Sequence, residues 1–289
     1  MSADALGVIG GSGLYEMEEL EQREEVRLAT PFGEPSDAYL VGRLSGRKVI
    51  FLPRHGRGHR IAPTEINSRA NLWGMKCLGA TRILSVSAVG SLREDITPGD
   101  FVAVDQFIDR TRHRPDTFFE RGVVAHVMFA DPVCADLRAV LLEAARAAGV
   151  TVHDGGTYVN MEGPQFSTRA ESRWYRGLGA DVIGMTNLQE ARLAREAELC
   201  YVTLAMATDY DCWHTAHGDV SVEAILEVMA RNIAHARTTV RNVVGRLTAE
   251  RRCPCKDALR YAILTEPARI PPEAKDRLGL LIARHLARS

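Results

Sequence analysis

The chain has 289 residues, of which 46% are hydrophobic and 25% are charged, so it is long enough to bury one full-sized core. Its 36 basic and 37 acidic residues leave a formal net charge of −1, which excludes the strong basic field that attracts nucleic acid. No apolar run approaches the ~20 residues that cross a bilayer, and residues 1–6 lack the features of a signal peptide. We therefore expect a cytoplasmic protein with no membrane partner and no nucleic-acid partner.

Short apolar or β-branched runs alternate with helical patterns along the chain. The runs predict strands at 6–9, 48–52, 82–86, 101–104, 156–159, 181–183 and 200–206. Several of them alternate poorly between apolar and polar residues, which is typical of strands buried on both faces. Helical patterns fall at 64–78, 135–148, 168–178, 188–197 and 220–247, and the second is followed by Gly149, a usual helix stop. The alternation predicts an α/β fold with a mixed, largely parallel sheet covered by helices.

The last forty residues differ from the rest. Residues 251–254 interrupt the pattern, and helical character returns at 255–264 and 272–287, so we expect one domain over 1–250 and a helical extension over 251–289. The extension contains Cys253-Pro-Cys255, whose spacing is not the CxxC of redox and zinc motifs. A metal site would need more soft ligands nearby, so structural thiols are the simplest interpretation. A disulfide within the tail, or to another cysteine, is the alternative.

Three segments that follow predicted strands could bind an anion. The first, Gly10-Gly-Ser-Gly13, offers backbone N–H groups and a hydroxyl, and the second, residues 53–60, carries several Arg and His side chains between glycines. The third, residues 85–91, places small residues and Ser87 after a buried strand. A tight turn or a solvated basic loop would explain each segment alone. Because ligands of open α/β sheets lie beyond the carboxyl ends of strands, the three together favour one anion site.

Two further segments suit a planar ring. Asp209 and Asp211 follow the predicted strand at 200–206, and if the extended geometry continued they would point to the same side and could bind adjacent donors on a base. Phe166 follows a Gly-Pro turn and precedes a helix that Ser167 or Thr168 would cap, and it could stack on a ring. An acidic turn and an ordinary loop with a helix cap are the alternatives.

In this order, the five segments resemble the trimeric branch of the purine nucleoside phosphorylase superfamily, and within it the 5′-methylthioadenosine phosphorylases. The similarity runs from Gly7 to about Val244, and its most specific stretches are residues 54–57, 90–94, 105–110, 162–166, 169–172 and 205–213. The resemblance implies a mixed sheet that is partly closed like a barrel, and a homotrimer with active sites near subunit boundaries. It also implies no metal and no organic cofactor, with inorganic phosphate as a co-substrate.

The resemblance assigns roles residue by residue. It implies that phosphate is bound by Ser12, Arg54, His55, Ser87, the Ala88 backbone and Thr186. The ribose would lie on Met185 and the base against Phe166, with Asp209 at N7 as the catalytic acid and Asp211 at the exocyclic amine. The pocket for the 5′ substituent would be lined by Val222, Ile225 and Leu226, and His126 would come from a neighbouring subunit.

Two departures from the family pattern stand out. Ser12 and Ser87 occupy positions where many relatives carry Thr, but the hydroxyl is retained. The tail is longer than in the animal enzymes, and similar tails occur in some bacterial and archaeal relatives, where disulfides are sometimes formed. The role of the tail in this chain is left open by the resemblance.

The implied reaction is phosphorolysis of 5′-methylthioadenosine to adenine and 5-methylthioribose 1-phosphate, a step of purine and methionine salvage. A carboxylate at Asp211 accepts from the amine of a 6-amino purine, whereas relatives that prefer 6-oxo purines carry Asn and Glu instead. Apolar Val222 favours a methylthio group, and relatives that take a 5′-hydroxyl tend to place His there. The alternatives are a broader purine nucleoside or 5′-methylthioinosine phosphorylase, a nucleosidase that uses water, and a non-catalytic nucleoside-binding or scaffold protein.

Overall fold

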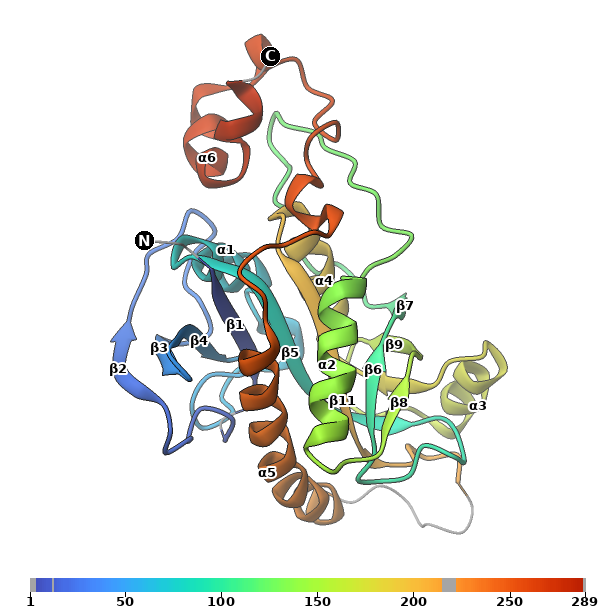
Figure 1. The fold of residues 1–289 in the computed structure, drawn as a ribbon. Helices are drawn as coiled ribbons and strands as arrows, with labels where there is room; N and C mark the ends of the chain where they lie inside the picture. Colours follow the sequence, from blue (N-terminus) through green and yellow to red (C-terminus); the bar gives the residue numbers. More distant parts are fainter. Residues whose placement is uncertain (1–3, 12, 215–221, 288–289) are drawn as a thin grey trace.

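The computed structural model describes residues 4–11, 13–214 and 222–287, without the side chains of residues 223–225. It contains one 11-stranded sheet with helices on both faces (Figure 1). The strands are β1 (Ala5–Gly10), β2 (Glu21–Val26), β3 (Tyr39–Leu44), β4 (Arg47–Pro53), β5 (Ala80–Ser91), β6 (Phe101–Val104), β7 (Gln106–Arg110), β8 (Val152–Asp154), β9 (Thr157–Met161), β10 (Val182–Gly184) and β11 (Cys200–Asp209). The α-helices are α1 (Ser68–Cys77), α2 (Ala135–Ala147), α3 (Arg169–Gly177), α4 (Asn187–Glu196), α5 (Val222–Arg246) and α6 (Pro272–Leu286).

Strand β5 lies at the centre of the sheet and pairs with three other strands. It runs parallel to β1 on one side and to β11 on the other, and its last residues pair antiparallel with β10. Strand β1 in turn pairs parallel with β4. The carboxyl ends of β1, β4, β5 and β11 therefore open at the same edge of the sheet, where ligands of such sheets bind.

Six strands curve into a partly closed barrel. They pair in the order β6, β11, β5, β10, β9, β7, and the two end strands are separated along the chain by Asp105 alone. The side chains inside form a separate apolar cluster drawn from five of the six strands and from Ile96, and Phe107 of the sixth strand, β7, packs against it. The strand residues of the cluster are Val89, Val102, Val104, Tyr158, Val182, Ala205 and Ala207. This arrangement confirms the expected mixed sheet, partly closed like a barrel.

The two faces of the open part of the sheet are covered by different helices. Leu6 and Val8 of β1 pack in one cluster with α2 and α5, whereas Ala5 and Ile9 pack in another with α1 and α4. Because neighbouring residues of a strand point to opposite faces, the split places the helix pairs on opposite sides (Figure 1).

The seven predicted strands and the five predicted helices of residues 1–250 are all present. Thr168 caps α3 and forms a capping box with Glu171, and Gly149 follows α2 with a φ of 77°. The prediction missed β2, β3, β7 and β8. Two of these have weak signals, because β2 is an exposed, charged edge strand and β8 has only three residues.

The extension over 251–289 is only partly helical. The helix expected at 255–264 is wrong: a short 3-10 turn spans Pro254–Asp257, and the chain then runs to an isolated bridge between Ala125 and Ile263. Pairing with a distant segment therefore overrides the local helical pattern. Helix α6 forms as predicted, and its apolar face joins the same cluster as α1 and α4. Within the described part of the chain, no helix is both long enough and apolar enough to span a membrane.

Candidate active site

The anion-binding segments predicted from the sequence meet at the edge where the parallel strands end. Gly10 is level with Pro53 in the pairing of β1 and β4, and the Arg54 N–H donates to the Gly10 carbonyl oxygen at 2.9 Å. Ser87 and Ala88 lie on β5 next to this point. Ser12, the hydroxyl proposed in the glycine turn, lies outside the described residues. The fold thus brings the glycine turn, Arg54 and Ser87 together, as the parallel strands predict.

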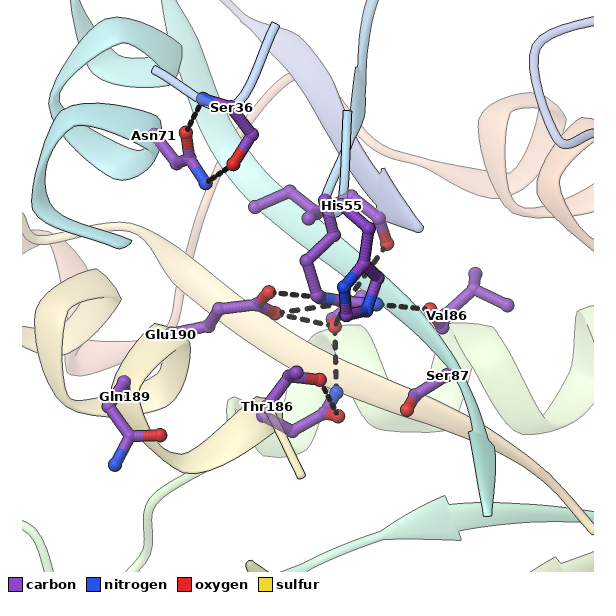
Figure 2. Close-up of polar contacts among 12 residues, drawn as sticks. Ser36, His55, Asn71, Val86, Ser87, Thr186, Gln189 and Glu190 are labelled. Atoms are coloured by element: carbon purple, nitrogen blue, oxygen red, sulfur yellow. Dashed lines mark hydrogen bonds and ion pairs between the residues drawn. The ribbon is translucent and has the colours of Figure 1, made fainter. Parts of the chain in front are cut away.

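The side chain of Arg54 is buried in an ion pair with Glu190 of α4. Its Nε donates to Glu190 Oε1 at 2.5 Å, and its Nη2 donates to Glu190 Oε2 and to Ser85 Oγ (Figure 2). Its Nη1 donates to the Val86 carbonyl oxygen at 3.0 Å. Of the five N–H hydrogens, one on Nη1 is left for an anion, so Arg54 cannot grip phosphate with a two-pronged fork.

Glu190 sits in a network of polar side chains that the sequence did not predict. Ser85 and Tyr201 both lie within donating distance of Glu190 Oε2, at 2.7 and 3.1 Å. The Asn187 amide donates to Ser85 Oγ and to Thr203 Oγ1. A buried ion pair is tolerated when its remaining lone pairs are satisfied in this way. The only signal in the sequence was Arg54 itself, since an arginine that becomes buried is costly unless its charge is paired.

The side chain of His55 points to the same region, and its imidazole ring is neutral. Its Nδ1 lies 2.8 Å from the Ile61 carbonyl oxygen, and its ring stacks on His59. Burial, with the positive charge of Arg54 nearby, lowers the pKa of His55 to about 4. The Ile61 carbonyl accepts the Nδ1 hydrogen, so Nε2 carries a lone pair at neutral pH. It can accept a hydrogen bond from a protonated phosphate oxygen.

Two hydroxyls flank the Arg54–Glu190 pair. Ser87 Oγ donates to the Ala88 carbonyl oxygen at 3.2 Å. Thr186 Oγ1 donates to Asn187 Oδ1 at 3.3 Å (Figure 2). Both bonds are long, so either hydroxyl can turn to an anion at little cost. Thr186 is also the N-cap of α4, whose positive dipole end favours negative charge there.

Tyr158 is a second polar residue near this point that the sequence did not single out. Burial raises the pKa of the Tyr158 hydroxyl. Within the described part of the chain, this buried hydroxyl has no hydrogen-bond partner. A buried unpaired hydroxyl beside two candidate phosphate ligands is a place where a ligand atom would be stabilised.

Asp209 and Asp211 lie together at the end of β11, although not for the reason expected. Strand β11 ends at Asp209, and Asp211 has a φ of 51°, so the extended geometry does not continue. A turn returns the chain instead, and the Asp211 N–H donates to Asp209 Oδ1 at 2.7 Å. Both side chains lie against Gly90 of β5: a Cβ atom there would lie 3.0 Å from Asp209 Oδ1 and 3.2 Å from the Asp211 Cβ.

Burial affects the two acids in the same direction. Burial raises the pKa of both, and the charge of Asp211 raises the pKa of Asp209 further. At both carboxyls burial outweighs the hydrogen bonds that act in the opposite direction, so the pKa of each lies above its ordinary value. Two neighbouring buried carboxyls repel each other when both are ionised, and this favours a state in which one of them carries a proton.

Met185 and Phe166 border the same end of the sheet. The Met185 carbonyl accepts from the Arg114 guanidinium and the Asn160 amide, and its sulfur lies against Gly163. Arg114 also pairs with Glu162, so residues 162–163 are tied to Met185. Phe166 is 52% exposed and offers an open ring face.

The residues proposed for the 5′ pocket and the subunit boundary are not gathered with the others. Val222 and Leu226 lie exposed at the start of α5, and the side chain of Ile225 lies outside the described residues. Further along, Ile233 packs over Gly13, and the Asn232 amide donates to the Ala207 carbonyl oxygen. The middle of helix α5 therefore passes near the site. The side chain of His126 is exposed, and its backbone N–H donates to the Ala262 carbonyl oxygen of the extension.

The described residues that could hold a metal ion lie elsewhere. They are the four cysteines Cys134, Cys200, Cys253 and Cys255. Cys200 begins β11 and Asp209 ends it, so about 30 Å of strand separates this cluster from the acid pair.

Comparison with known proteins shows the family of this chain. The model of the phosphorylase superfamily matches residues 5–245. The S-methyl-5′-thioadenosine phosphorylase of Geobacter sulfurreducens is 61% identical over 282 residues, covering 97% of this chain and 99% of the relative. The crystal structure of a methylthioadenosine phosphorylase sourced from an antarctic soil metagenomic library superposes with a TM-score of 0.93 at 45% identity, covering 97% of this chain and 99% of that one.

A more distant structure carries a ligand. The methylthioadenosine phosphorylase of Schistosoma mansoni in complex with adenine has a TM-score of 0.82 at 35% identity, covering 96% of this chain and 97% of that one. A variant of the Schistosoma protein has been solved in complex with methylthioadenosine, at a TM-score of 0.81 and 34% identity over 96% of this chain and 97% of that one.

The fold and the match over residues 5–245 define the class: the chain belongs to the phosphorylase superfamily. Within the superfamily, it belongs to the S-methyl-5′-thioadenosine phosphorylases, as the full-length identity to the Geobacter enzyme shows. The resemblance stated from the sequence motifs is confirmed.

Proposed function

We propose that this protein catalyses phosphorolysis of S-methyl-5′-thioadenosine to adenine and 5-methylthioribose 1-phosphate. The observation that carries the proposal is the spacing on β5. Ser87, at the anion end, and Gly90, beneath the Asp209–Asp211 pair, are three residues apart on one strand. Three residues of strand span about 10 Å, which leaves room for one pentose between a phosphate and a purine.

Asp209 is the proposed general acid. The Thr208 hydroxyl lies 2.7 Å from Asp209 Oδ2 and 3.2 Å from the Val89 carbonyl oxygen, and it has one hydrogen to give. When that hydrogen goes to Val89, Asp209 can be protonated and donate to Thr208. The surroundings thus accommodate a neutral Asp209 that turns its proton to N7 as the purine leaves. General acid assistance of this kind contributes roughly 10²–10⁴-fold in rate.

The phosphate end works mainly through dipoles. The charge of Arg54 is balanced by Glu190, so a bound dianion would rely on other donors. The candidates are one Nη1 hydrogen of Arg54, the Ser87 and Thr186 hydroxyls, the Ala88 N–H, the N-terminus of α4 and the glycine turn with Ser12. Fixed donors in a dry site stabilise charge without reorganising during the reaction.

The bond changes balance without a cofactor. The C1′–N9 bond breaks with its electron pair on the purine, which takes the Asp209 proton at N7. A phosphate oxygen forms the new bond to C1′ as positive charge develops there. The proton that phosphate loses on becoming an ester returns through solvent to Asp209.

Specificity for methylthioadenosine would depend on contacts with its base and with its 5′ methylthio group. Asp211, in its ionised form, would accept from the 6-amino group of adenine. Phe166 and Met185 would flank base and ribose, and Val222, Ile225 and Leu226 would enclose the methylthio group.

We also propose the homotrimer implied by the family motifs, with His126 reaching a neighbour's site. His126 is flanked by exposed apolar side chains, namely Val124, Met128, Tyr261 and Leu264, with Met128 84% exposed. An apolar surface of this kind is typical of a protein interface. Light scattering on the purified protein should give three times the chain mass; a monomeric mass would contradict the proposal.

The assay that tests the reaction compares methylthioadenosine, adenosine and inosine with and without phosphate, and identifies the free base by chromatography. We expect adenine from methylthioadenosine, and only when phosphate is present. Base release without phosphate would indicate a nucleosidase, and preferred release of hypoxanthine would overturn the role of Asp211. Binding without turnover would indicate a non-catalytic protein.

A further inference from the structure

Four cysteines from three distant segments converge at the end of β11 opposite to the candidate active site. Cys134 is the N-cap of α2, Cys200 is the first residue of β11, and Cys253 and Cys255 flank Pro254 at the start of the extension. Their four sulfur atoms all lie within 4.8 Å of one another, and all four residues are at most 7% exposed.

The surrounding backbone holds the cysteines in place. The Cys134 N–H donates to the Tyr201 carbonyl oxygen at 2.9 Å, which fixes the start of α2 against the start of β11. Pro254 opens the 3-10 turn whose N-cap is Cys253, so the two tail cysteines approach on a short, constrained segment. The site is therefore assembled by the fold and does not depend on one flexible loop.

We propose that Cys134, Cys200, Cys253 and Cys255 form a structural zinc site. Four thiolates around one Zn²⁺ at about 2.3 Å place their sulfurs about 3.8 Å apart in a tetrahedron. The observed spacing, with every pair within 4.8 Å and the Cys200 and Cys253 sulfurs 3.3 Å apart, fits such a centre. Soft thiolate ligands select Zn²⁺ over Mg²⁺ and Ca²⁺. On binding, four thiols release four protons to solvent and leave a site with a net charge of two minus.

The arrangement favours one centre over two disulfides. A disulfide needs two sulfurs at about 2.05 Å and draws the four cysteines into two separate pairs. Here each sulfur is close to all three others, as four ligands of a common ion are. In the sequence, only Cys253 and Cys255 lie close together, and for this pair we expected no metal. The fold brings Cys134 and Cys200 to them and so supplies the two further soft ligands that such a site requires.

An arginine beside the cluster suits a negative site. Arg251 lines the small cavity next to Cys134, Cys200 and Cys253, together with Arg82 and Arg252 and the acids Asp136 and Glu250. The Arg251 guanidinium donates to the carbonyl oxygens of Thr81 and Glu198, which are uncharged groups. Its positive charge is therefore available to a zinc tetrathiolate.

The site would anchor the extension to the main domain. Two ligands come from the extension and two from residues 134–200, so the ion would close the chain just where the extension begins. Further along, residues 262–265 hydrogen-bond with residues 124–126, the segment that carries His126. A clamp at Cys253 and Cys255 would hold this arrangement together on heating.

The test starts from the intact protein, purified without chelator and analysed for metals by mass spectrometry. We expect about one zinc per chain, released when the thiols are modified by an organomercurial and detected with a zinc-sensitive dye. The double variant Cys253→Ser/Cys255→Ser should lose the zinc and unfold at a lower temperature. Cys77→Ser is the matched control, because Cys77 is exposed and lies outside the cluster, and it should keep the full zinc content.

Two results would overturn the proposal. One is wild-type protein without bound metal in which all four thiols are free. The other is a loss of hydrogens in the intact mass under denaturing, non-reducing conditions, which would show disulfides in place of the ion. If the double variant does not fold, Co²⁺ replacement in the wild-type protein still decides: tetrahedral thiolate coordination gives intense visible bands, and their absence contradicts the site.

Discussion

The Nε atom of Arg54 lies 2.5 Å from Oε1 of Glu190, and both side chains are at most 3% exposed. This pair joins the end of β4 to helix α4 beneath the candidate phosphate site. It places a guanidinium where an anion would bind while cancelling most of its charge. The candidate phosphate site is therefore lined by an arginine whose principal partner is another side chain.

Replacing Glu190 tests this relationship. Glu190→Gln leaves the Arg54 charge buried without its counter-ion, and breaking such a pair costs about 3–5 kcal/mol. We expect a marked fall in the unfolding temperature by calorimetry, and a larger gain in stability on adding phosphate than the wild-type protein shows, because the dianion then meets an uncompensated charge. An unchanged phosphate effect would show that Arg54 does not face the anion.

Asp209→Asn removes the proposed acid while keeping its shape. We expect kcat to fall roughly 10²–10⁴-fold with little change in the KM for methylthioadenosine, because the proton is needed chiefly in the transition state. Steady-state kinetics measure both constants. Near-normal turnover would remove Asp209 from its role.

Gly90→Ala should disturb the acid pair from below. The added Cβ would meet Asp209 Oδ1 at 3.0 Å and Ile183 Cγ2 at 3.1 Å, so the carboxylates must shift. A displacement on the order of 1 Å can cost about 10²-fold in rate, and we expect at least a tenfold loss of kcat. Gly245→Ala is the control, since nothing lies within 4 Å of its Cβ position, and its activity should be unchanged. Equal activity of the two variants would contradict the geometry.

His55 should make the protein sensitive to acid. Its pKa is about 4 in the folded chain and 6.5 when unperturbed, so between these values the unfolded chain binds more protons and stability falls as pH falls. The loss is at most about 3 kcal/mol, and less because the ring is partly exposed. His55→Asn keeps a donor for Ile61 but does not titrate. The gap in unfolding temperature between wild type and variant should shrink from pH 7 to pH 4.5; a constant gap would contradict the neutral ring.

Val222→His tests the 5′ pocket. A histidine could bind a 5′-hydroxyl and would lose apolar contact with a methylthio group. We expect the ratio of kcat/KM for methylthioadenosine over adenosine to fall about tenfold or more. Val222→Ala is the comparison, because it weakens the apolar contact without offering a partner to the hydroxyl. If the two variants show the same ratio, Val222 does not contact the 5′ group.

The sequence by itself predicted the central strands, the helices of residues 1–250 and the edge of the sheet where the candidate site lies. Buried runs predicted the central strands, and Thr168 with Glu171 marked the start of α3, because such patterns depend on neighbours within one or two turns of chain. The convergence of the glycine turn, Arg54 and Ser87 was also predictable, since parallel strands end at one edge. The domain boundary at residue 250, the roles of the site residues, the trimer and the cytoplasmic location stay predictions.

Only the tertiary structure decided which distant groups meet. It paired Arg54 with Glu190, brought Asp211 beside Asp209 by a turn in place of a continued strand, and set residues 262–265 against residues 124–126. It also gathered Cys134 and Cys200 with the two tail cysteines. Local periodicity carries no information about strand order, register or the path of the tail. These depend on how all the apolar faces are buried at once, and the partners of a buried charge or thiol follow from that packing.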